Sequence, residues 1–288
     1  MKKLITLLMA SVMTFGLCAC GGPKEVIDIS EGSADSFENE LKTDEAQPAG
    51  DERKTFIVGF DAEFPPYGYM DENGEYVGFD LDLAQEVCNR RGWELVKQPI
   101  DWDAKDMELS SGSIDCIWNG FTINGREDSY TFSVPYVDNS QVYVVKADSN
   151  IKTEADLAGK VVGVQADSSA LAALEDEEGK ADLAKTFADL VQFADYNTGF
   201  MNLESGAIEV LAMDIGVANY EISSRNGEFV ILDDQLASEQ YGIGFLKGNT
   251  ELKDQVESTL LEMVADGTFE KIAEKYADYG LVDSICLK

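Results

Sequence analysis

A polar turn follows a short apolar segment in the first half of the chain. The segment Ile114–Trp118 leads into a turn that offers an amide, a glycine, a hydroxyl and a cation: Asn119, Gly120, Thr122 and Arg126. Open α/β sheets bind ligands where strands end in such turns, and a guanidinium can hold a carboxylate through two parallel hydrogen bonds. The stretch therefore predicts a site for a carboxylate or another small anion, with Arg126 as the clamp. The alternative is an ordinary connection in which Arg126 pairs in solvent with Glu127 or Asp128.

A second candidate site lies in a segment that repeats the pattern of the first. Residues 109–120 align without gaps with residues 203–214, and each segment reads as a helix end, a Ser-Gly turn and a strand with a polar end. The repeat predicts two similar lobes with Asn119-Gly120 and Asp214 at equivalent strand ends. If the lobes face each other, the Arg126 cation and the Asp214 carboxylate lie across one cleft, which suits a zwitterion such as an α-amino acid. Taken alone, Asp214 is better explained as the N-cap of the following helix.

Other candidate residues stand at predicted strand ends and helix starts. A first strand at residues 55–60 is followed by a turn that contains Asp61 and Phe64. Trp102 stands at the start of a later short helix. A third turn carries two hydroxyls before a helix whose free amides and positive dipole end face the loop. These side chains are Asp61, Phe64, Trp102, Ser168 and Ser169. Each also has a purely structural interpretation, as a turn carboxylate, a core aromatic or a helix cap.

The order of elements predicts the fold class. Strands and helices alternate in two series after residue 54, a pattern typical of a mostly parallel sheet flanked by helices. We therefore predict an α/β fold with two lobes joined by two strands. Lobe 1 is expected to comprise residues 55–143 and 241–288, and lobe 2 residues 144–240.

The N-terminal segment is typical of an exported protein. Two lysines precede a short apolar run at residues 4–17, which favours a secretory signal over a membrane-spanning helix. The following Leu17-Cys18-Ala19-Cys20 resembles a bacterial lipobox, in which the last cysteine is lipidated. We therefore expect residues 1–20 to be a lipoprotein signal with the lipid on Cys20; the alternative is a plain secretory peptide. Residues 21–54 are acidic and poor in large apolar side chains, which predicts a disordered tether.

Composition excludes several kinds of function. The chain of 288 residues has a formal net charge of −33, from 22 basic and 55 acidic side chains. A surface so negative is unsuited to nucleic acid or to direct docking on anionic lipid. The absence of histidine removes the usual general base and the commonest metal ligand,, and it excludes a Ser-His-Asp or Cys-His mechanism. The cysteines lack zinc-type spacing. We expect neither a metal nor another cofactor.

Together, the segments resemble the solute-binding proteins of amino-acid ABC importers (family 3), which have the two-lobed, type II periplasmic-binding-protein-like fold. The resemblance covers nearly everything from Thr55 to Tyr279. The matching motifs are Phe60-Asp-Ala-Glu-Phe-Pro-Pro-Tyr67, Val77-Gly-Phe-Asp-Leu-Asp-Leu-Ala84, Asp101-Trp-Asp103, Ser111-Gly-Ser-Ile-Asp115, Gly120-Phe-Thr-Ile123, Phe132-Ser-Val-Pro-Tyr136 and Val162-Gly-Val-Gln165.

The resemblance implies a role for each candidate residue in lobe 1. Arg126 would grip the α-carboxylate of the ligand, and the turn before it would add hydrogen bonds from Asn119, Gly120 and Thr122. Phe64 and Trp102 would form aromatic walls, and Asp61 would lie near the side-chain end of the ligand. The segment from Thr122 to Arg126 is one residue shorter than the common pattern. Arg126 is still assigned as the clamp, because no other basic residue is near it.

The resemblance also implies the roles in lobe 2. Asp214 would receive the α-ammonium of the ligand. Ser169, with Ser168 beside it, would give the carboxylate a hydroxyl contact at the start of a helix. Asp167 stands where the family usually has a glycine, so the detailed contacts in this turn depart from the pattern. Asp61 and Glu63 point to a polar or basic ligand.

The implied function is solute capture outside the cytoplasm. The protein would be a monomeric, non-enzymatic lipoprotein that binds a free, polar amino acid by hinge closure and passes it to an ABC permease in the membrane. The hinge is expected near Val142–Lys146 and Tyr241–Leu246. Two alternatives stay open. One is a surface sensor that binds an amino acid but serves no permease. The other is an enzyme like the cyclohexadienyl dehydratases that use this fold, with Asp61, Glu63 or Asp167 as acid or base.

Overall fold

The computed structural model describes residues 53–225 and 227–288. The predicted signal with Cys20, and nearly all of the predicted tether at 21–54, lie outside the described residues. All described elements belong to one unit of the chain, Gly50–Lys288. Within this described part, no helix has both the length and the apolar character that a bilayer-spanning helix needs.

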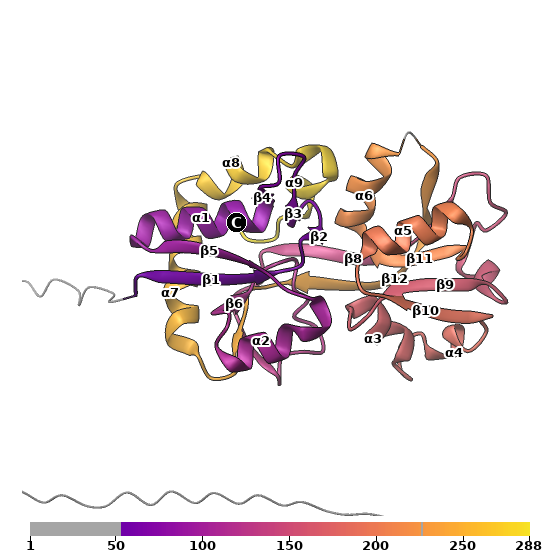
Figure 1. Ribbon diagram of the computed structural model, residues 1–288, viewed down its shortest axis with the longest axis horizontal. Helices are drawn as coiled ribbons and strands as arrows, with labels where there is room; N and C mark the ends of the chain where they lie inside the picture. Colours follow the sequence, from indigo (N-terminus) through magenta and orange to yellow (C-terminus); the bar gives the residue numbers. More distant parts are fainter. Residues whose placement is uncertain (1–52, 226) are drawn as a thin grey trace, which may run out of the picture. The chain divides into compact units, whose positions relative to one another are not determined.

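A first sheet gathers segments from the two ends of the described chain. Among the described residues it has five strands, in the order β5-β1-β6-β13-β7. Its strands are β1 (Thr55–Phe60), β5 (Glu94–Pro99), β6 (Cys116–Ile117), β7 (Tyr130–Phe132) and β13 (Gly244–Leu246). Its helices are α1 (Phe79–Arg91), α2 (Lys105–Ser111), α7 (Thr250–Ala265) and α8 (Thr268–Glu274). Helices α1 and α2 cover opposite faces of this sheet (Figure 1).

A second sheet contains the middle of the chain. In the part that the structure describes, its five strands follow the order β10-β9-β11-β8-β12. They are β8 (Val137–Lys146), β9 (Val161–Gln165), β10 (Asp189–Phe193), β11 (Val210–Asp214) and β12 (Phe229–Tyr241). The helices beside it are α3 (Ser169–Glu175), α4 (Ala181–Ala184), α5 (Tyr196–Ser205) and α6 (Ile215–Ser224). Helix α3 lies on one face of the sheet, and α5 and α6 lie on the other (Figure 1).

Smaller elements complete the described chain. A small antiparallel sheet of order β2-β3-β4 follows β1. Its strands are β2 (Glu63–Phe64), β3 (Gly68–Met70) and β4 (Tyr76–Val77), and the short helices are η1 (Trp102–Ala104), η2 (Glu154–Leu157), η3 (Ala277–Tyr279) and α9 (Leu281–Ser284).

The predicted two-lobed α/β fold is confirmed, but its sheets are mixed. In each sheet two neighbouring pairs are parallel and two are antiparallel. The repeat seen in the sequence has a structural counterpart. Gly112 ends α2 with φ 77° and ψ 16°, and Gly206 ends α5 with φ 77° and ψ 17°. The strands that follow, β6 and β11, take the third place in their sheets, so the polar residues after them lie at equivalent strand ends.

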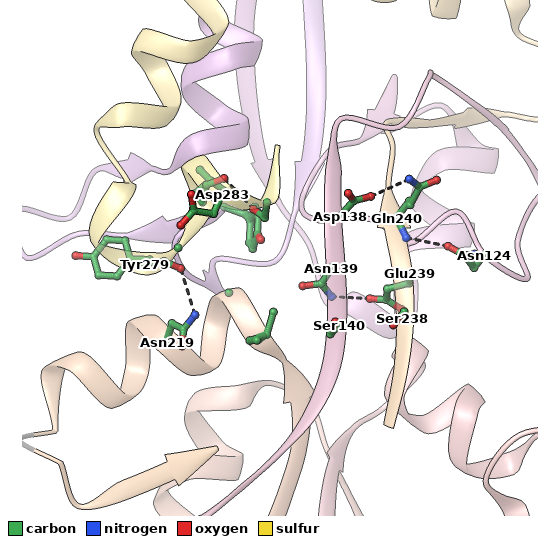
Figure 2. Close-up of a pocket in the computed structure, with 16 residues that line it drawn as sticks. Asn124, Asp138, Asn139, Ser140, Asn219, Ser238, Glu239, Gln240, Tyr279 and Asp283 are labelled. Atoms are coloured by element: carbon green, nitrogen blue, oxygen red, sulfur yellow. Dashed lines mark hydrogen bonds between the residues drawn. The ribbon is translucent and has the colours of Figure 1, made fainter. Parts of the chain in front are cut away.

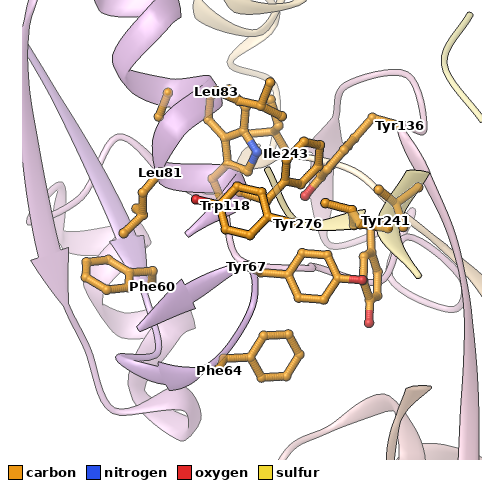
Figure 3. Packing of buried hydrophobic residues seen from close by; sticks show 14 of the residues in the cluster. Phe60, Phe64, Tyr67, Leu81, Leu83, Trp118, Tyr136, Tyr241, Ile243 and Tyr276 are labelled. Atoms are coloured by element: carbon orange, nitrogen blue, oxygen red, sulfur yellow. The ribbon is translucent and has the colours of Figure 1, made fainter. Parts of the chain in front are cut away.

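Burial explains why these central strands read as apolar runs. All five residues of β11, Val-Leu-Ala-Met-Asp, are buried, as expected for a strand covered by helices on both faces. Asp214 is thus a carboxylate at the end of a buried strand. In lobe 1, Phe60, Trp118 and Tyr136 pack in a large aromatic and aliphatic cluster, part of which Figure 3 shows.

One buried carboxylate in lobe 1 has an unexpected role. Asp80 lies in the first turn of α1, whose N-cap position is Gly78. Asp80 is fully buried, and its Oδ2 accepts hydrogen bonds from the Gly120 N–H at 2.7 Å and the Tyr136 hydroxyl at 2.8 Å. Burial raises the pKa of Asp80 to about 7. Asp80 therefore fixes the turn after β6 rather than the start of a helix.

Two long antiparallel strands connect the lobes. Residues 141–145 of β8 pair with β11, and all of these except Tyr143 also pair with β12, whereas residues 137–140 pair with residues 238–241 of β12. Tyr241 also forms a bridge to Thr122 of lobe 1. The sequence does not predict β12, because polar pairs interrupt its apolar pattern. In the structure, the pairing of β12 with β8 changes register after Ile231.

Candidate functional site

The predicted site residues from the two lobes meet where the strands end. Asp61 directly follows β1, and Gln165 is the last residue of β9 in the other lobe. The Gln165 Nε2 donates a hydrogen bond to Asp61 Oδ2 at 2.7 Å. Asp61 is 6% exposed and Gln165 2% exposed. The carboxyl ends of parallel strands from both sheets therefore meet in one contact region between the lobes, which we call the cleft. Asp61 is one of the predicted site residues, whereas the sequence did not single out Gln165.

Two aromatic side chains form parallel walls on the lobe-1 side. The rings of Phe64 and Trp102 are stacked with an interplanar angle of 7° and centroids 6.5 Å apart. Both are largely buried. Tyr196 from lobe 2 approaches Phe64 with ring centroids 5.9 Å apart. Figure 3 shows Phe64 beside Tyr67, whose ring in turn meets Tyr241 edge-on. The predicted aromatic walls are therefore brought together.

Arg126 reaches from the lobe-1 turn to lobe 2. Its Nη1 donates to the Thr122 carbonyl at 3.3 Å, and its Nη2 donates to the Asp167 carbonyl at 3.3 Å. The guanidinium lies over the Phe121 ring, 5.0 Å from its centroid. Burial lowers the pKa of Arg126, and the charges of Glu239, Asp167 and Asp214 oppose this change. Arg126 is thus a cation held in the cleft and not a surface residue paired with its sequence neighbours.

Asp214 is not a side-chain cap. It occupies the N-cap position of α6, but its carboxylate makes no capping hydrogen bond to the described residues of that helix. It is 4% exposed and accepts hydrogen bonds from Asn139 Nδ2 at 2.9 Å, Gln141 Nε2 at 2.6 Å and the Tyr196 hydroxyl at 2.9 Å. The Tyr241 hydroxyl also donates to it. These donors orient the carboxylate, as a residue that binds a ligand ammonium requires.

A second buried carboxylate lies beside Asp214. Glu239 Oε1 accepts hydrogen bonds from the same two amide nitrogens, Asn139 Nδ2 at 2.7 Å and Gln141 Nε2 at 2.8 Å. Burial is the main cause that raises the pKa of Asp214 to about 7, and the charge of Glu239 raises it further. Glu239, Asn139 and Gln141 all lie on the connecting strands β8 and β12. Sequence reasoning missed them because it treated these strands as a hinge without polar function.

Asp61 has a similarly perturbed carboxyl group. Burial raises its pKa to about 6, against the lowering effect of hydrogen bonds from the Glu63 N–H and from Gln165. Its own N–H donates to Asn119 Oδ1 at 3.0 Å. Asn119, which is fully buried, therefore orients the turn that carries Asp61. Asn119 therefore lies within the site, but its Oδ1 accepts a hydrogen bond from the protein backbone.

The Gly120 amide is not a free donor, contrary to the prediction. Its N–H is bound by Asp80. The φ of Gly120 is +58°, and a Cβ at this position would lie 2.8 Å from Phe64 Cε1. Gly120 thus serves close packing under the aromatic wall. Thr122 is 3% exposed, and its carbonyl accepts from Arg126, so it orients the clamp through its main chain.

The two serines of lobe 2 differ in role. Ser168 caps α3, because its Oγ accepts from the Leu171 N–H at 3.1 Å and donates to the Gln165 carbonyl at 2.7 Å. The structural alternative thus holds for Ser168. Ser169 Oγ accepts from Gln141 Nε2 at 2.9 Å, which joins it to the network around Asp214. Ser169 remains the predicted hydroxyl contact for a ligand.

A second cation lies next to Arg126. The sequence has no other basic residue close to Arg126, but in space the Lys105 ammonium reaches the same lobe-2 residue. Lys105 is 2% exposed, and its Nζ pairs with the Asp167 carboxylate. The charge of Arg126 adds to the effect of burial in lowering the pKa of Lys105. A lysine at the first position of a short helix is typical of a surface residue, so no sequence pattern predicts this contact.

A cavity of about 540 Å³ opens beside the connecting strands, toward α6 and α9 (Figure 2). Glu239 and Asn139 line it, together with the carboxylates of Asp138 and Asp283. Its described lining residues include no lysine or arginine. The described lining of this cavity is therefore negative.

Known proteins share both the sequence pattern and the fold. The family described as "Bacterial extracellular solute-binding proteins, family 3" matches residues 56–279. The L-cystine-binding protein TcyJ of Escherichia coli (strain K12) is 29% identical over 228 residues, which cover 78% of this chain and 83% of TcyJ. The arginine-binding extracellular protein ArtP of Bacillus subtilis (strain 168) is 28% identical over 286 residues, with 96% of this chain and 98% of ArtP covered.

Solved structures agree with this assignment. A substrate-binding protein of an ABC uptake transporter from Streptococcus pneumoniae, with bound histidine, has a TM-score of 0.73 and 33% identity; 77% of this chain and 92% of that chain are covered. An ancestral arginine-binding protein bound to glutamine has a TM-score of 0.71 and 36% identity, with 78% and 99% covered. The family match spans most of the chain, and the fold and the cleft agree with it. This chain therefore belongs to family 3 of the bacterial extracellular solute-binding proteins.

Proposed function

We propose that this protein captures a free amino acid between its two lobes and delivers it to an ABC permease. The observation that carries the proposal is the placement of one cation and one oriented carboxylate in the same cleft. Arg126, from lobe 1, would hold the ligand carboxylate through paired hydrogen bonds. Asp214, from lobe 2, accepts several hydrogen bonds that aim its carboxylate, and it would receive the ligand ammonium.

The charges of the cleft favour a ligand with a cationic side chain. Lys105 and Asp167 pair with each other, and a zwitterion would use Arg126 and Asp214. Two buried carboxylates, Asp61 and Glu239, then stay without a cation to balance them. A buried carboxylate is costly unless it is paired. A ligand that brings one further positive charge would therefore bind more tightly than a neutral amino acid.

The aromatic walls favour a planar group on that side chain. Phe64 and Trp102 have parallel ring planes with centroids 6.5 Å apart, so both rings could contact the faces of one planar group. A guanidinium or imidazolium between them would stack on both rings and lie near Asp61. Arginine and histidine have this shape and charge, and the structural relatives described above include a protein with bound histidine and an arginine-binding protein.

Closure would occur about the two connecting strands. We place the hinge at residues 137–140 and 238–241, because these segments pair with each other beyond the part of β8 that β11 holds. This lies before the expected crossing at Val142–Lys146. A bridging ligand favours closure only through contacts that it makes in the closed arrangement and loses in the open one.

The proposed setting is the outer face of a bacterial membrane. The lipobox at Cys20 would anchor a monomer by its lipid, and residues 21–54 would tether the body within reach of a permease. Growth on a single amino acid, or uptake of the labelled ligand, should fall when the gene is deleted. A surface sensor that serves no permease would leave uptake unchanged.

Calorimetric titration tests the ligand class directly. The purified protein, freed of carried ligand by unfolding and refolding, is titrated with each common amino acid and with cystine. We expect the tightest binding with arginine or histidine, and a loss of binding in Arg126→Ala and Asp214→Ala. Equal affinity for neutral and cationic amino acids would refute the charge argument, and no binding by folded protein would refute the proposal.

We also infer that the protein is not an enzyme. A dehydratase would need an acid near the leaving group, and Asp61, with its pKa of about 6, is the best candidate. Both of its carboxylate oxygens accept hydrogen bonds from the protein, which suits a fixed binding group. Incubation with cyclohexadienyl substrates should yield no aromatic product.

A further inference from the structure

The ion pair between Lys105 and Asp167 joins the two lobes beside the proposed ligand cleft. Lys105 is the first residue of α2 in lobe 1, and Asp167 stands in the turn between β9 and α3 in lobe 2. The Lys105 Nζ bonds to the Asp167 carboxylate and donates to the Trp102 carbonyl at 3.3 Å. It also lies over the Trp102 ring, 5.0 Å from the centroid. The lysine is therefore fixed within the lobe-1 wall and faces lobe 2.

The backbone at Asp167 is adapted to this contact. Among the described residues, Asp167 is the only one other than glycine with a positive φ, at 54°. This left-handed conformation is unfavourable for most L-residues, whereas glycine adopts it freely. Glycine at this position would keep the carbonyl that Arg126 contacts at 3.3 Å. What the aspartate adds, and glycine cannot supply, is the carboxylate that Lys105 holds.

The pair can form only when the lobes approach each other. Lys105 has its ammonium buried, whereas the Asp167 side chain is 55% exposed. Separation of the lobes would leave the lysine without its carboxylate and return Asp167 to water. A contact made only in the closed arrangement stabilises that arrangement relative to the open one by its full free energy. The pair also borders Trp102, a wall of the cleft, and precedes the serines at the start of α3.

We propose that Lys105 and Asp167 form a cross-lobe clasp that controls how slowly the bound ligand is released. The proposal rests on the proposed function, since release is defined for the amino acid held between the lobes. Neither residue is assigned a contact with the ligand. Both are positioning residues, because they act on the ligand through closure of the lobes and through the placement of Arg126 and Trp102.

Release kinetics test the clasp. The dissociation rate of the amino acid identified by calorimetry is measured by stopped-flow for the wild type, Lys105→Met, Asp167→Asn and the double variant. Asparagine tolerates the left-handed conformation, and methionine keeps the buried stem of lysine. We expect each single variant to release the ligand about tenfold faster, and the double variant to release it no faster than either single one, because one shared contact is lost.

A matched control separates the clasp from a general effect of charge. Lys180 pairs with Glu154 at 2.7 Å, and both residues belong to lobe 2. Lys180→Met should therefore leave the dissociation rate unchanged. If Lys105 instead bound the ligand, Asp167→Asn would free the lysine and slow release, which would overturn the proposal. Unchanged rates in the Lys105 and Asp167 variants, or additive effects in the double variant, would overturn it too.

A second measurement does not depend on the ligand. Small-angle X-ray scattering of the ligand-depleted protein reports how far the lobes separate on average. The clasp predicts a larger radius of gyration for Lys105→Met and Asp167→Asn than for the wild type and Lys180→Met. Equal radii in all four proteins would overturn the clasp even if the amino-acid ligand were never found. A failure to bind any amino acid would instead refute the proposed function and leave this comparison intact. Should Lys105→Met fail to fold, Asp167→Asn carries both tests, because its side chain is half exposed.

Discussion

Ligand affinity should rise with pH between 6 and 8, because Asp214 must be ionised to receive an ammonium group. Burial and the neighbouring Glu239 raise the pKa of Asp214 to about 7. Tyr196 and Tyr241, which donate to it, have pKa values well above the usual range because of burial, so they keep their protons throughout. Arg126, whose charge acts on both Asp214 and Glu239, stays charged over this pH range as well. Under the proposed function, the carboxylate that would bind the ligand ammonium is thus the group that titrates in this range.

The size of the effect follows from the titration of one group. With a pKa of about 7, roughly one tenth of Asp214 is ionised at pH 6 and roughly nine tenths at pH 8. If only the ionised form binds, the dissociation constant falls about tenfold over this range, which corresponds to about 1.4 kcal/mol. Binding at pH 7 should release about half a proton. Asp61, whose pKa is about 6, acts in the same direction at the acidic end.

Calorimetry in buffers of different ionisation enthalpy measures both quantities. The ligand must keep its own charges over the range, which arginine does. In Asp214→Asn the binding should be weak at every pH, without the proton release that this carboxyl contributes. In Glu239→Gln the midpoint should move to lower pH, because the charge that raises the pKa of Asp214 is gone. An affinity independent of pH in the wild type, with no proton released, would refute the assignment of Asp214 as ammonium acceptor.

The other predictions concern individual side chains. Arg126→Lys should weaken binding by about 2 kcal/mol, because an ammonium cannot form the paired hydrogen bonds of a guanidinium; calorimetry checks it. Asp61→Asn should reduce the preference for cationic over neutral amino acids, measured by competition. Gly120→Ala should destabilise the fold by about 1–3 kcal/mol in chemical denaturation, since its Cβ would lie 2.8 Å from Phe64 at a positive φ,. Burial raises the pKa of Asp80 to about 7, so the stability that it contributes is present below pH 4 and is lost as the pH rises through 7. The wild type should therefore melt at a lower temperature at pH 8 than at pH 5. Asp80→Asn should reduce this difference in melting temperature.

The sequence was sufficient for the parts of the fold that obey a local period. Strand β11 reads as a buried apolar run because helices cover both of its faces, and the glycines at 112 and 206 end their helices in the left-handed conformation that an L-residue disfavours,. Strand β12 could not be read in this way. Its residues pair with β8 through irregular register, and Glu239 is the one buried polar side chain among its described residues. The burial of Glu239 depends on tertiary contacts with β8 and Asp214, which no local pattern of this segment records.

The candidate site shows the same difference: some of its residues have a local sequence signal, and others are recognised only in the tertiary structure. Arg126 and Asp214 stand after apolar strands, and a strand end is a local signal, so both were predicted and both lie in the cleft. The amides of Asn139 and Gln141, the carboxylate of Glu239 and the ammonium of Lys105 face the same cleft from elements whose sequence gives them no special place. What makes them part of the site is the approach of two sheets, and hence contacts across long sequence separations. The residues proposed to hold a ligand were therefore readable from the chain, whereas those proposed to set the charge between the lobes and their closure required the tertiary structure.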